Sequence, residues 1–412
     1  MNQLQLFLPC AAGVEDMLAH EAAFITGGTL DGVRRQRGGV LIEGAWRDAL
    51  LLNLHSRLAQ RVLVQLFHAP YRNEQDLYRA ASEVAWEIWF TPRQSMKVEV
   101  TAQHSPLNSL NFAALKIKDA ICDRFRARAG GVRPDVDTRW PDIRIYAHLT
   151  TDTVSLYIDT SGEALFKRGW REDKGEAPLK ETLAAAMIAS CGWAQDPSVP
   201  LYDPCCGSGT IAIEAAQIAC QIAPGSLRRF AFEKMLPFQA HVWEAIRQEA
   251  LRAQQLPPAG ARPTIFGSDL AHRMVDFAQR NAQRAGVAHA IEFRGGDALQ
   301  RMPPCAAPGI LLLNPPYGER IEAGGVAGSR AREQALAPEG GDFFTQLAAH
   351  WKKHYAGWSA WVLTPDRKLP GKMRLKESRK IPMWNGPIEC RLFRFDMVRG
   401  SARSDAGPSP AA

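Results

Sequence analysis

The sequence predicts an α/β fold for the C-terminal half, with an open, mostly parallel sheet covered by helices on both faces, preceded by an α+β region. Three observations predict this. The apolar run Gly309–Leu313 has the length and composition of a strand buried on both faces. Residues Val199–Asp203 read as a short strand that leads through a glycine-containing turn into a helix. Before residue 165, short strands alternate with helical segments, which is typical of an α+β region.

Length and composition indicate a globular protein of two or three domains. The chain has 412 residues, of which 46% are hydrophobic and 23% charged, and one core rarely grows beyond about 250–300 residues. The sequence has neither a run of about 18 apolar residues nor a charged segment followed by an apolar one at its N-terminus. We therefore expect a cytoplasmic protein with no membrane partner. The eight cysteines form no C-x-x-C pair, which favours free thiols and no bound metal.

The charge balance is compatible with a polyanionic partner. The net charge is +7 and the isoelectric point is near 9.0. Residues 1–170 hold 20 Lys and Arg against 19 Asp and Glu, so any basic surface in that half must be local. The run Asp366–Lys380 has seven basic residues in fifteen. It reads either as a solvated loop or as a rim that contacts phosphates.

The first 165 residues read as short strands and helices. Residues 1 to about 60 have strand patterns at Leu4–Pro9 and Gly39–Glu43, and helical patterns beginning near Gly13 and at Asp48–Leu58. Further strands are expected at Arg61–Phe67, Met96–Ala102, Ile143–Leu149 and Thr153–Asp159, the last two forming a hairpin. Helices are expected at Glu74–Trp86 and Asn111–Arg128. The second helix has an expected buried stripe of Phe112, Leu115, Ile117, Ile121, Cys122 and Phe125.

A basic segment and a glycine turn follow. Residues 165–171 place Lys167, Arg168 and Arg171 around two aromatic rings. After a linker, a helix is expected from Glu181 to near Gly192, then the strand ending at Asp203 and a helix over Thr210–Ile222. Gly207 and Gly209, in the turn between strand and helix, allow close approach of the backbone to a ligand. The third glycine of the dinucleotide-binding fingerprint is absent, so a pyrophosphate cradle is disfavoured.

The strand Gly309–Leu313 ends at Asn314-Pro315-Pro316-Tyr317. Ligands in open α/β sheets sit outside the carboxyl ends of strands, so chemistry is expected at this corner. An exocyclic amine is a poor nucleophile until acceptors hold its hydrogens, and the Asn314 side-chain oxygen and the Pro315 carbonyl can each accept one. The two prolines make the turn rigid, and the Tyr317 ring can stack on a base. If the donor is a sulfonium, no activated nucleophile is required, and positioning by itself is a large catalytic contribution.

The remaining segments complete the sheet. Strands are expected at Thr264–Asp269, Ala290–Asp297 and Trp358–Leu363, a helix at Asp342–Tyr355, and an antiparallel edge within Arg379–Phe395. The insertion between Pro224 and Pro263 lengthens the spacing between the first two acidic strand ends, and either a substrate contact or a packing role fits it. Residues 401–412 have the composition of a disordered tail.

The basic helix, the hairpin and the segment Leu165–Arg171 resemble a THUMP RNA-binding domain joined to a class I methyltransferase. The series Asp203, Asp269, Asp297 and Asn314 resembles the strand ends of that enzyme class. The family resembled is the RlmL type of ribosomal RNA large-subunit guanine-N2 methyltransferases, which implies a Rossmann-like sheet. On this resemblance we expect a ferredoxin-like unit at 1–60, a THUMP-like domain at 61–168, a linker at 169–180 and the methyltransferase domain at 181–400.

The resemblance also implies the cofactor, the partner and the roles of the site residues. S-adenosylmethionine would be bound by Asp203 at its ammonium group, Asp269 at its ribose and Asp297 at its adenine, with further contacts from Cys205, Gly207, Ser208, Gly209, Thr210 and Asn314. Asn314, Pro315, Pro316 and Tyr317 would hold the guanine. RNA, as large-subunit ribosomal RNA or an assembly intermediate, would contact Lys167, Arg168, Arg171 and Arg320. The oligomeric state is left open.

Several alternatives share these motifs. A transfer RNA guanine-N2 methyltransferase has both the THUMP domain and the Asn-Pro-Pro-Tyr motif. Adenine-N6 DNA methyltransferases and release-factor glutamine methyltransferases have the motif, and the THUMP-like half argues against both. A non-catalytic RNA-binding assembly factor would keep the fold, and the intact acidic series argues against it. Carbon methylation is disfavoured because it generally uses a cysteine nucleophile, and the motif has none.

Overall fold

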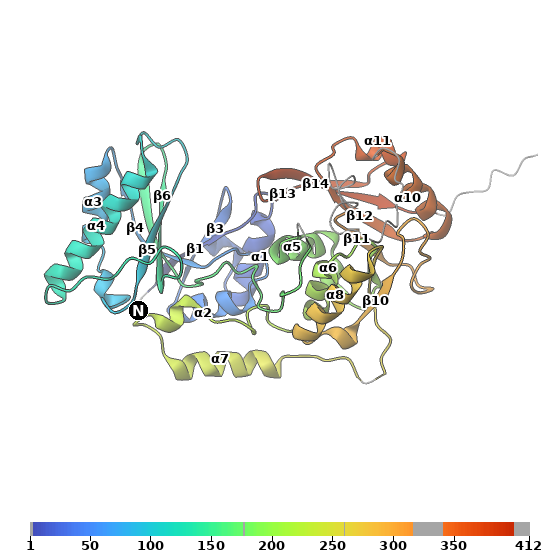
Figure 1. Ribbon diagram of the computed structural model, residues 1–412, viewed down its shortest axis with the longest axis horizontal. Helices are drawn as coiled ribbons and strands as arrows, with labels where there is room; N and C mark the ends of the chain where they lie inside the picture. The colour runs from blue at the N-terminus through green and yellow to red at the C-terminus, as the bar shows by residue number, and fades with distance from the viewer. Residues whose placement is uncertain (1–2, 176–177, 259, 316–340, 399–412) are drawn as a thin grey trace, which may run out of the picture.

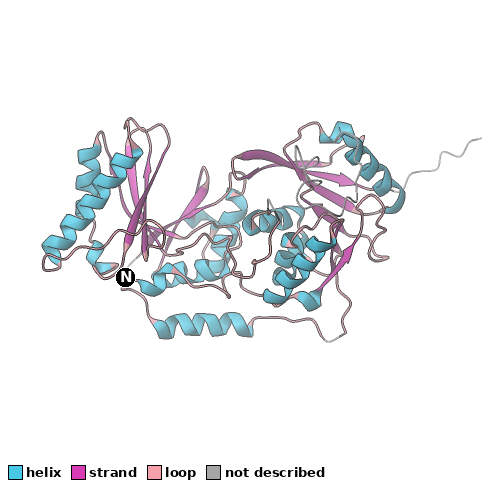
Figure 2. Cartoon of the chain, in the orientation of Figure 1, coloured by secondary structure: helices cyan, strands magenta, loops and turns pink. Residues whose placement is uncertain are grey.

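Two sheets organise the molecule, one in each half of the chain. The computed structural model describes residues 3–175, 178–258, 260–315 and 341–398. In this part of the chain each sheet has seven strands, and the two sheets lie toward opposite ends of an elongated molecule (Figure 1). Helices pack beside both sheets (Figure 2). The expected combination of an α+β half and an α/β half is confirmed.

The N-terminal sheet has the order β2-β3-β1-β4-β7-β6-β5 and is antiparallel except at the β5–β6 pair. Because β1 pairs with both β3 and β4, the residues before and after position 60 share one continuous sheet. The edge strand β2 was not predicted, since three of its four residues are exposed and polar. The strands are β1 (Leu4–Pro9), β2 (Val33–Gln36), β3 (Gly39–Gly44), β4 (Leu63–Pro70), β5 (Met96–Ala102), β6 (Ile143–Leu149) and β7 (Thr153–Asp159).

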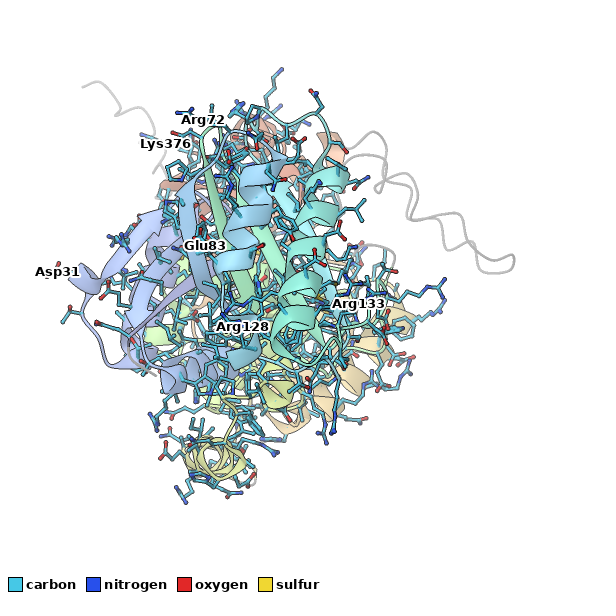
Figure 3. All side chains as sticks on the ribbon, turned by 90° about the vertical axis from the view of Figure 1, so that its left-hand side faces the viewer. Asp31, Arg72, Glu83, Arg128, Arg133 and Lys376 are labelled. Carbon is cyan, nitrogen blue, oxygen red and sulfur yellow. The ribbon has the colours of Figure 1, made fainter. Side chains whose placement is uncertain are left out.

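Four helices accompany this sheet: α1 (Glu15–Thr26), α2 (Trp46–His55), α3 (Glu74–Glu83) and α4 (Leu110–Arg128). The apolar stripe expected on α4 is wrong at two positions, because Phe112 and Leu115 are 47% and 53% exposed. Ala113 and Ala120 are buried instead, together with Ile117, Ile121, Cys122 and Phe125. α4 packs against α3, whose buried face also has two alanines. Figure 3 looks onto these two helices and shows charged side chains such as Glu83 and Arg128 on their outer side.

The C-terminal sheet has the order β10-β9-β8-β11-β12-β14-β13. The first five strands are parallel, and β14 and β13 add an antiparallel edge. The strands are β8 (Leu201–Asp203), β9 (Ile265–Asp269), β10 (Ile291–Gly295), β11 (Ile310–Leu313), β12 (Ser359–Thr364), β13 (Arg379–Asn385) and β14 (Ile388–Asp396). The α-helices of this half, within the described ranges, are α5 (Glu181–Cys191), α6 (Thr210–Ala219), α7 (Ala240–Arg252), α8 (His272–Arg284), α10 (Gly341–His354) and α11 (Leu369–Met373).

Strand β11 is buried on both faces, as its continuous apolar run predicts. Leu312 belongs to the core that also contains residues of α5 and α6. Leu311 and Leu313 point the other way, into a second core with Phe344 and Trp351 of α10. The strand therefore has a fixed position in the sheet, and the backbone that follows Leu313 leaves the sheet edge at a defined place.

The insertion between Pro224 and Pro263 packs against the N-terminal half. The amide of Gly225 donates a hydrogen bond to the carbonyl of Leu54, at 2.9 Å, and a Cβ at this position would lie 2.9 Å from the same oxygen. Phe230 and Phe232 stack on each other at 5.1 Å, and the Trp243 ring of α7 meets both edge-on. Of the two roles left open by the sequence, the structure gives this aromatic cluster the packing role.

A buried ion-pair network joins the two halves at helix α6. Glu214 is fully buried, and its carboxylate contacts Arg168 Nε at 3.0 Å and Arg57 Nη1 at 3.2 Å. Arg168 also donates to the Arg57 carbonyl at 2.7 Å, and Arg57 donates to the Ile222 carbonyl at 2.6 Å. Arg57 belongs to the N-terminal half and Glu214 to the C-terminal half, so these contacts fix one half against the other.

Removing Arg168 should destabilise the protein strongly. Arg168→Ala leaves the buried Glu214 carboxylate with one of its two cations, and loss of one partner of a buried pair costs roughly 3–5 kcal/mol. The neighbouring Lys167 has a side chain 56% exposed in an i,i+4 pair with Glu163, so Lys167→Ala should cost about 0.5 kcal/mol or less. Urea unfolding followed by tryptophan fluorescence measures both. Equal shifts in the two variants would contradict this account of the junction.

Candidate active site

Four polar residues that are distant in sequence meet at the carboxyl edge of the parallel strands. Asp203 and Asp269 are the last residues of β8 and β9, Asp297 lies two residues beyond β10, and Asn314 follows β11 directly. These strands are neighbours in the order β10-β9-β8-β11. Because parallel strands end on the same side of a sheet, the four residues expected from the sequence are brought to one edge.

Asp203 is the most buried of these acids, with 2% of its surface exposed. Its Oδ1 accepts a hydrogen bond from the Cys205 amide at 3.1 Å. Burial, and to a lesser extent the carboxylate of Asp269, raise the pKa of the Asp203 carboxyl to about 8. Among the described residues, no cation lowers the pKa of Asp203. The carboxyl is therefore poised to ionise when a cationic group is bound beside it.

Asp269 holds the glycine turn. The Gly207 amide donates to Asp269 Oδ2 at 2.9 Å, and the Ala271 amide donates to Oδ1 at 3.0 Å. Each oxygen keeps a further acceptor position, which suits two neighbouring hydroxyl groups. Gly209 has φ of 86°, and a Cβ there would lie 2.9 Å from the Cβ of Ala278 on α8. The turn therefore requires glycine at 209 to lie this close to the helix.

Ser208 and Thr210 anchor the turn from beneath and are both buried. The Ser208 carbonyl accepts from Asn281 Nδ2 at 3.1 Å, and Thr210 Oγ1 accepts from Arg171 Nη2 at 2.7 Å. Asn281 was missed in the sequence, although it occurs at helical spacing among the buried positions Val275, Ala278 and Ala282 of α8. A side-chain amide on the apolar face of a helix is the sequence signal for such a residue, because a buried amide must find hydrogen-bond partners.

Cys205 and Cys206 lie in the same turn. Burial and the neighbouring aspartates raise the pKa of both thiols well above the ordinary value. Both are therefore neutral thiols rather than thiolates, and neither is an activated nucleophile.

Asn314 has an unused acceptor. Its Oδ1 is buried and makes no hydrogen bond to any described residue, and an unsatisfied buried acceptor costs about 1–3 kcal/mol. Pro315, also buried, follows it. Asp297 Oδ1 accepts from the Leu299 amide at 2.9 Å. Three of the predicted site residues, Pro316, Tyr317 and Arg320, lie outside the described residues.

Two of the residues predicted to contact RNA, Arg168 and Arg171, form ion pairs in the interior instead. Arg168 is 1% exposed and bonded to Glu214, and the Arg171 side chain is 11% exposed and paired with Glu181 at 2.9 Å. The prediction for both is wrong, because their guanidinium groups neutralise buried carboxylates at the junction of the two halves. Lys167 is exposed, as expected. The sequence pattern of three cations did not distinguish the buried from the exposed ones.

The described ranges contain neither a metal centre nor a membrane-spanning helix. No group of three or more His, Cys, Asp or Glu side chains is placed to hold a metal ion. No helix there has the length and apolar character that crossing a bilayer requires.

The strand order and the acids at successive strand ends define an α/β protein of the class that binds a nucleoside cofactor at the edge of the sheet. The chain belongs to the family described as RMKL-like, methyltransferase domain, whose model matches residues 168–394. A THUMP domain model matches residues 71–159, and an RlmL ferredoxin-like domain model matches residues 5–63. The resemblance to the RlmL type is confirmed.

Curated relatives carry the name "Ribosomal RNA large subunit methyltransferase K/L". The protein of that name from Shewanella amazonensis is 37% identical over 97% of this chain and 54% of its own length. The one from Psychromonas ingrahamii is 37% identical over 95% of this chain and 50% of its own length. The chain therefore spans about half the length of these relatives.

Solved structures agree with the fold. A putative methyltransferase complexed with SAH has a TM-score of 0.81 and 27% identity, covering 97% of this chain and all of its own. A predicted N6-adenine-specific DNA methylase from Listeria monocytogenes has a TM-score of 0.81 and 29% identity, covering 96% of each chain. TrmN from Thermus thermophilus, at 20% identity and a TM-score of 0.65, covers 96% of this chain and all of its own, and supports the fold alone.

The residues at the strand ends fit S-adenosylmethionine, the cofactor expected for this family of methyltransferases. Asp203 would hold the ammonium group, Asp269 the ribose hydroxyls and Asp297 the adenine. The glycine turn leaves space for the ligand, since a Cβ at Gly207 would meet nothing within 4 Å. When bound, this cofactor supplies an electrophilic methyl group on a sulfonium.

The raised pKa of Asp203 predicts pH-dependent cofactor binding. Below about pH 8 the carboxyl is mostly protonated in the free protein, and a cation favours its ionised form, so binding releases a proton. Affinity for S-adenosylmethionine should therefore rise with pH, by up to about tenfold per unit. The pH range of the titrations stays below 7.5, because the α-amino group of the cofactor itself loses its proton near pH 7.7–8.0. Isothermal titration calorimetry of the wild type and Asp203→Asn, which cannot ionise, measures this. Parallel pH profiles for the two would refute the role of Asp203.

Proposed function

We propose that the chain transfers the methyl group of S-adenosylmethionine to the exocyclic N2 amine of a guanine in 23S ribosomal RNA. The observation that carries this proposal is the buried, unpartnered Oδ1 of Asn314 at the end of β11. An acceptor left unsatisfied at the edge of a cofactor site is suited to a substrate N–H. The amine of guanine N2 brings two such hydrogens.

The chain's own residues would act by orientation. Asn314 Oδ1 accepts one amine hydrogen and the Pro315 carbonyl accepts the other, which turns the nitrogen lone pair outward. β11 is fixed by packing on both faces, so both acceptors are held in place before the substrate arrives, which is how positioning lowers a barrier. The neutral thiols of Cys205 and Cys206 favour this direct route over a covalent one. The proton of the amine would leave to water after transfer.

Ribosomal RNA is proposed as substrate from two findings. The THUMP domain model matches the N-terminal half, and the relatives named above are called ribosomal RNA large subunit methyltransferases. The choice of guanine N2 comes from the RlmL-type resemblance. With this substrate we propose a cytoplasmic location. A guanine in transfer RNA is the second candidate, since transfer RNA guanine-N2 methyltransferases also have the THUMP domain and the Asn-Pro-Pro-Tyr motif.

Replacing Asn314 tests the proposed chemistry. Asn314→Ala should lower the single-turnover rate on protein-free 23S ribosomal RNA by roughly 10²–10³-fold, the loss typical of one positioned polar group. Asn314→Asp keeps an acceptor oxygen and should retain more activity than alanine. Digestion of the labelled RNA to nucleosides identifies the product as N2-methylguanosine, and a cofactor titration shows whether each variant still binds S-adenosylmethionine.

Other results would change the proposal. N2-methylguanosine formed only in transfer RNA would replace the substrate and keep the mechanism. Labelled N6-methyladenine from duplex DNA, or methylglutamine from release factor, would refute the guanine assignment. A variant Asn314→Ala that binds the cofactor and reacts at the wild-type rate would refute the role of the amide.

A further inference from the structure

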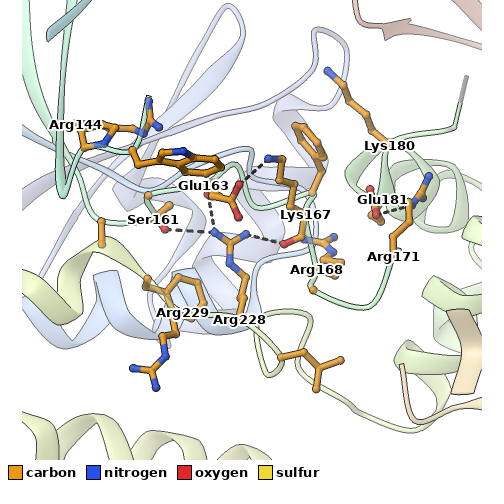
Figure 4. Close-up of a pocket in the computed structure, with 18 of the residues that line it drawn as sticks. Arg144, Ser161, Glu163, Lys167, Arg168, Arg171, Lys180, Glu181, Arg228 and Arg229 are labelled. Carbon is orange, nitrogen blue, oxygen red and sulfur yellow. Dashed lines mark hydrogen bonds and ion pairs between the residues drawn. The ribbon is translucent and has the colours of Figure 1, made fainter. Parts of the chain in front are cut away.

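A large cavity lies away from the strand ends, between the N-terminal half, the linker and the insertion. Its volume is about 780 Å³. Its walls come from residues 140–144 at the start of β6, from residues 161–169 after β7, from the linker up to Glu181 and from residues 227–234 of the insertion. Figure 4 shows the basic side chains that surround it. We call it the cationic cavity.

The cationic cavity has more basic than acidic side chains in its lining. Nine of its lining residues are Lys or Arg and three are Asp or Glu, which gives an excess of six. The net charge of the whole chain is +7. Arg168 is neutralised by Glu214 and Arg144 by Glu99, and neither acid lines the cavity. The exposed excess is therefore smaller than six, and it comes from both halves of the chain, through Lys167, Lys174 and Arg229.

Some of these cations serve the fold. Arg168 and Arg171 belong to the buried junction. Arg228 donates to the carbonyls of Ser161, Glu163, Ala164 and Lys167, at 2.6–3.3 Å. Arg228 thereby ties the insertion to the segment after β7, as Figure 4 shows. These three arginines shape the wall of the cavity.

Other cations face solvent. The Arg229 side chain is 94% exposed, and its nearest acid, Glu233, is 3.7 Å away. Lys174 is exposed. Lys167 and Lys234 are each 56% exposed and paired with Glu163 and Asp142. Exposed cations in weak surface ion pairs are suited to binding phosphate oxygens, because exchanging such a pair for a phosphate contact costs little free energy.

A tryptophan stands at the edge of the same cavity. Trp140 is 76% exposed, and its amide is held by Asp137 Oδ1 at 3.0 Å, with Pro141 next in the chain. An exposed tryptophan on a fixed turn, beside cations, offers a flat face on which an unpaired base can stack. A duplex hides its base faces, so the combination favours a single strand.

We infer that the cationic cavity binds a single-stranded segment of the RNA substrate, with phosphates beside Arg229 and Lys174 and one base stacked on Trp140. The inference rests on the proposed function, since that function supplies the RNA. An acidic peptide would use the cations and leave the tryptophan face without a partner. The cavity also touches the methyltransferase half through Arg171, whose guanidinium reaches Thr210 at the start of α6.

Binding of protein-free 23S ribosomal RNA by filter retention tests this site. Trp140→Ala should weaken binding by roughly five- to hundredfold, the range that one stacked base provides, and Trp140→Phe should recover most of it. The double variant Arg229→Ala, Lys174→Ala should weaken binding and reduce the slope of log K against log salt by about 1.4, or 0.7 for each lost phosphate contact on a single strand.

Matched controls lie outside the cavity. Phe24 is 88% exposed on α1, and Arg262 is exposed in the insertion, so Phe24→Ala and Arg262→Ala should bind RNA as the wild type does. Poly(U) should compete with 23S ribosomal RNA better than duplex RNA or poly-glutamate. A cofactor titration of each variant verifies that the fold is intact.

Failure of the site and failure of the function give different results. If the wild type binds and methylates RNA while the cavity variants behave like the controls, the site is refuted and the function stands. The site is also refuted if Trp140→Phe binds RNA no better than Trp140→Ala. Competition by duplex RNA or poly-glutamate that equals competition by poly(U) would refute it as well. If the wild type neither binds nor methylates RNA, both are refuted.

Discussion

The buried carboxylate of Glu214 is the constraint on which the arrangement of the two halves depends. It lies on α6, one helical turn beyond Thr210. It accepts hydrogen bonds from Arg57 of the N-terminal half and from Arg168 of the connecting segment. Arg171, three residues after Arg168, bonds to Thr210 at the start of the same helix. One rigid helix therefore carries both the junction and the cofactor turn, so the N-terminal half and the strand ends are held in a fixed geometry, as the proposed RNA substrate would require.

The strand ends differ from this junction in the state of their polar groups. The junction pairs each buried charge, whereas Asp203 is buried without a cation and Asn314 Oδ1 is buried without a donor in the described chain. Both cost stability in the absence of a ligand. A bound molecule that supplies the missing partners would remove these costs, so the two unpaired groups at the strand ends support a ligand site there.

The sequence predicted features that follow from local pattern and failed where packing decides. The parallel strands and their terminal acids follow from apolar runs that stop at polar residues, and Met96–Ala102, Ile143–Leu149 and Thr153–Asp159 form strands with the predicted bounds. Phe112 and Leu115 fall on the apolar stripe that helical spacing predicts, but α3 and α4 pack through alanines. The RNA contact expected for Arg168 comes from the family resemblance, and the burial of this side chain depends on Glu214, 46 residues away. Neither contact is visible in a linear pattern.

The central claim is that the methyl group arrives on guanine N2. The most direct measurement uses 23S ribosomal RNA transcribed with guanosine carrying ¹⁵N in the exocyclic amine, and S-adenosylmethionine carrying ¹³C in the methyl group. After reaction and digestion, the account predicts a methyl carbon signal split by one-bond coupling to the amine nitrogen. A methyl signal without that coupling would place the group on another atom and contradict the account.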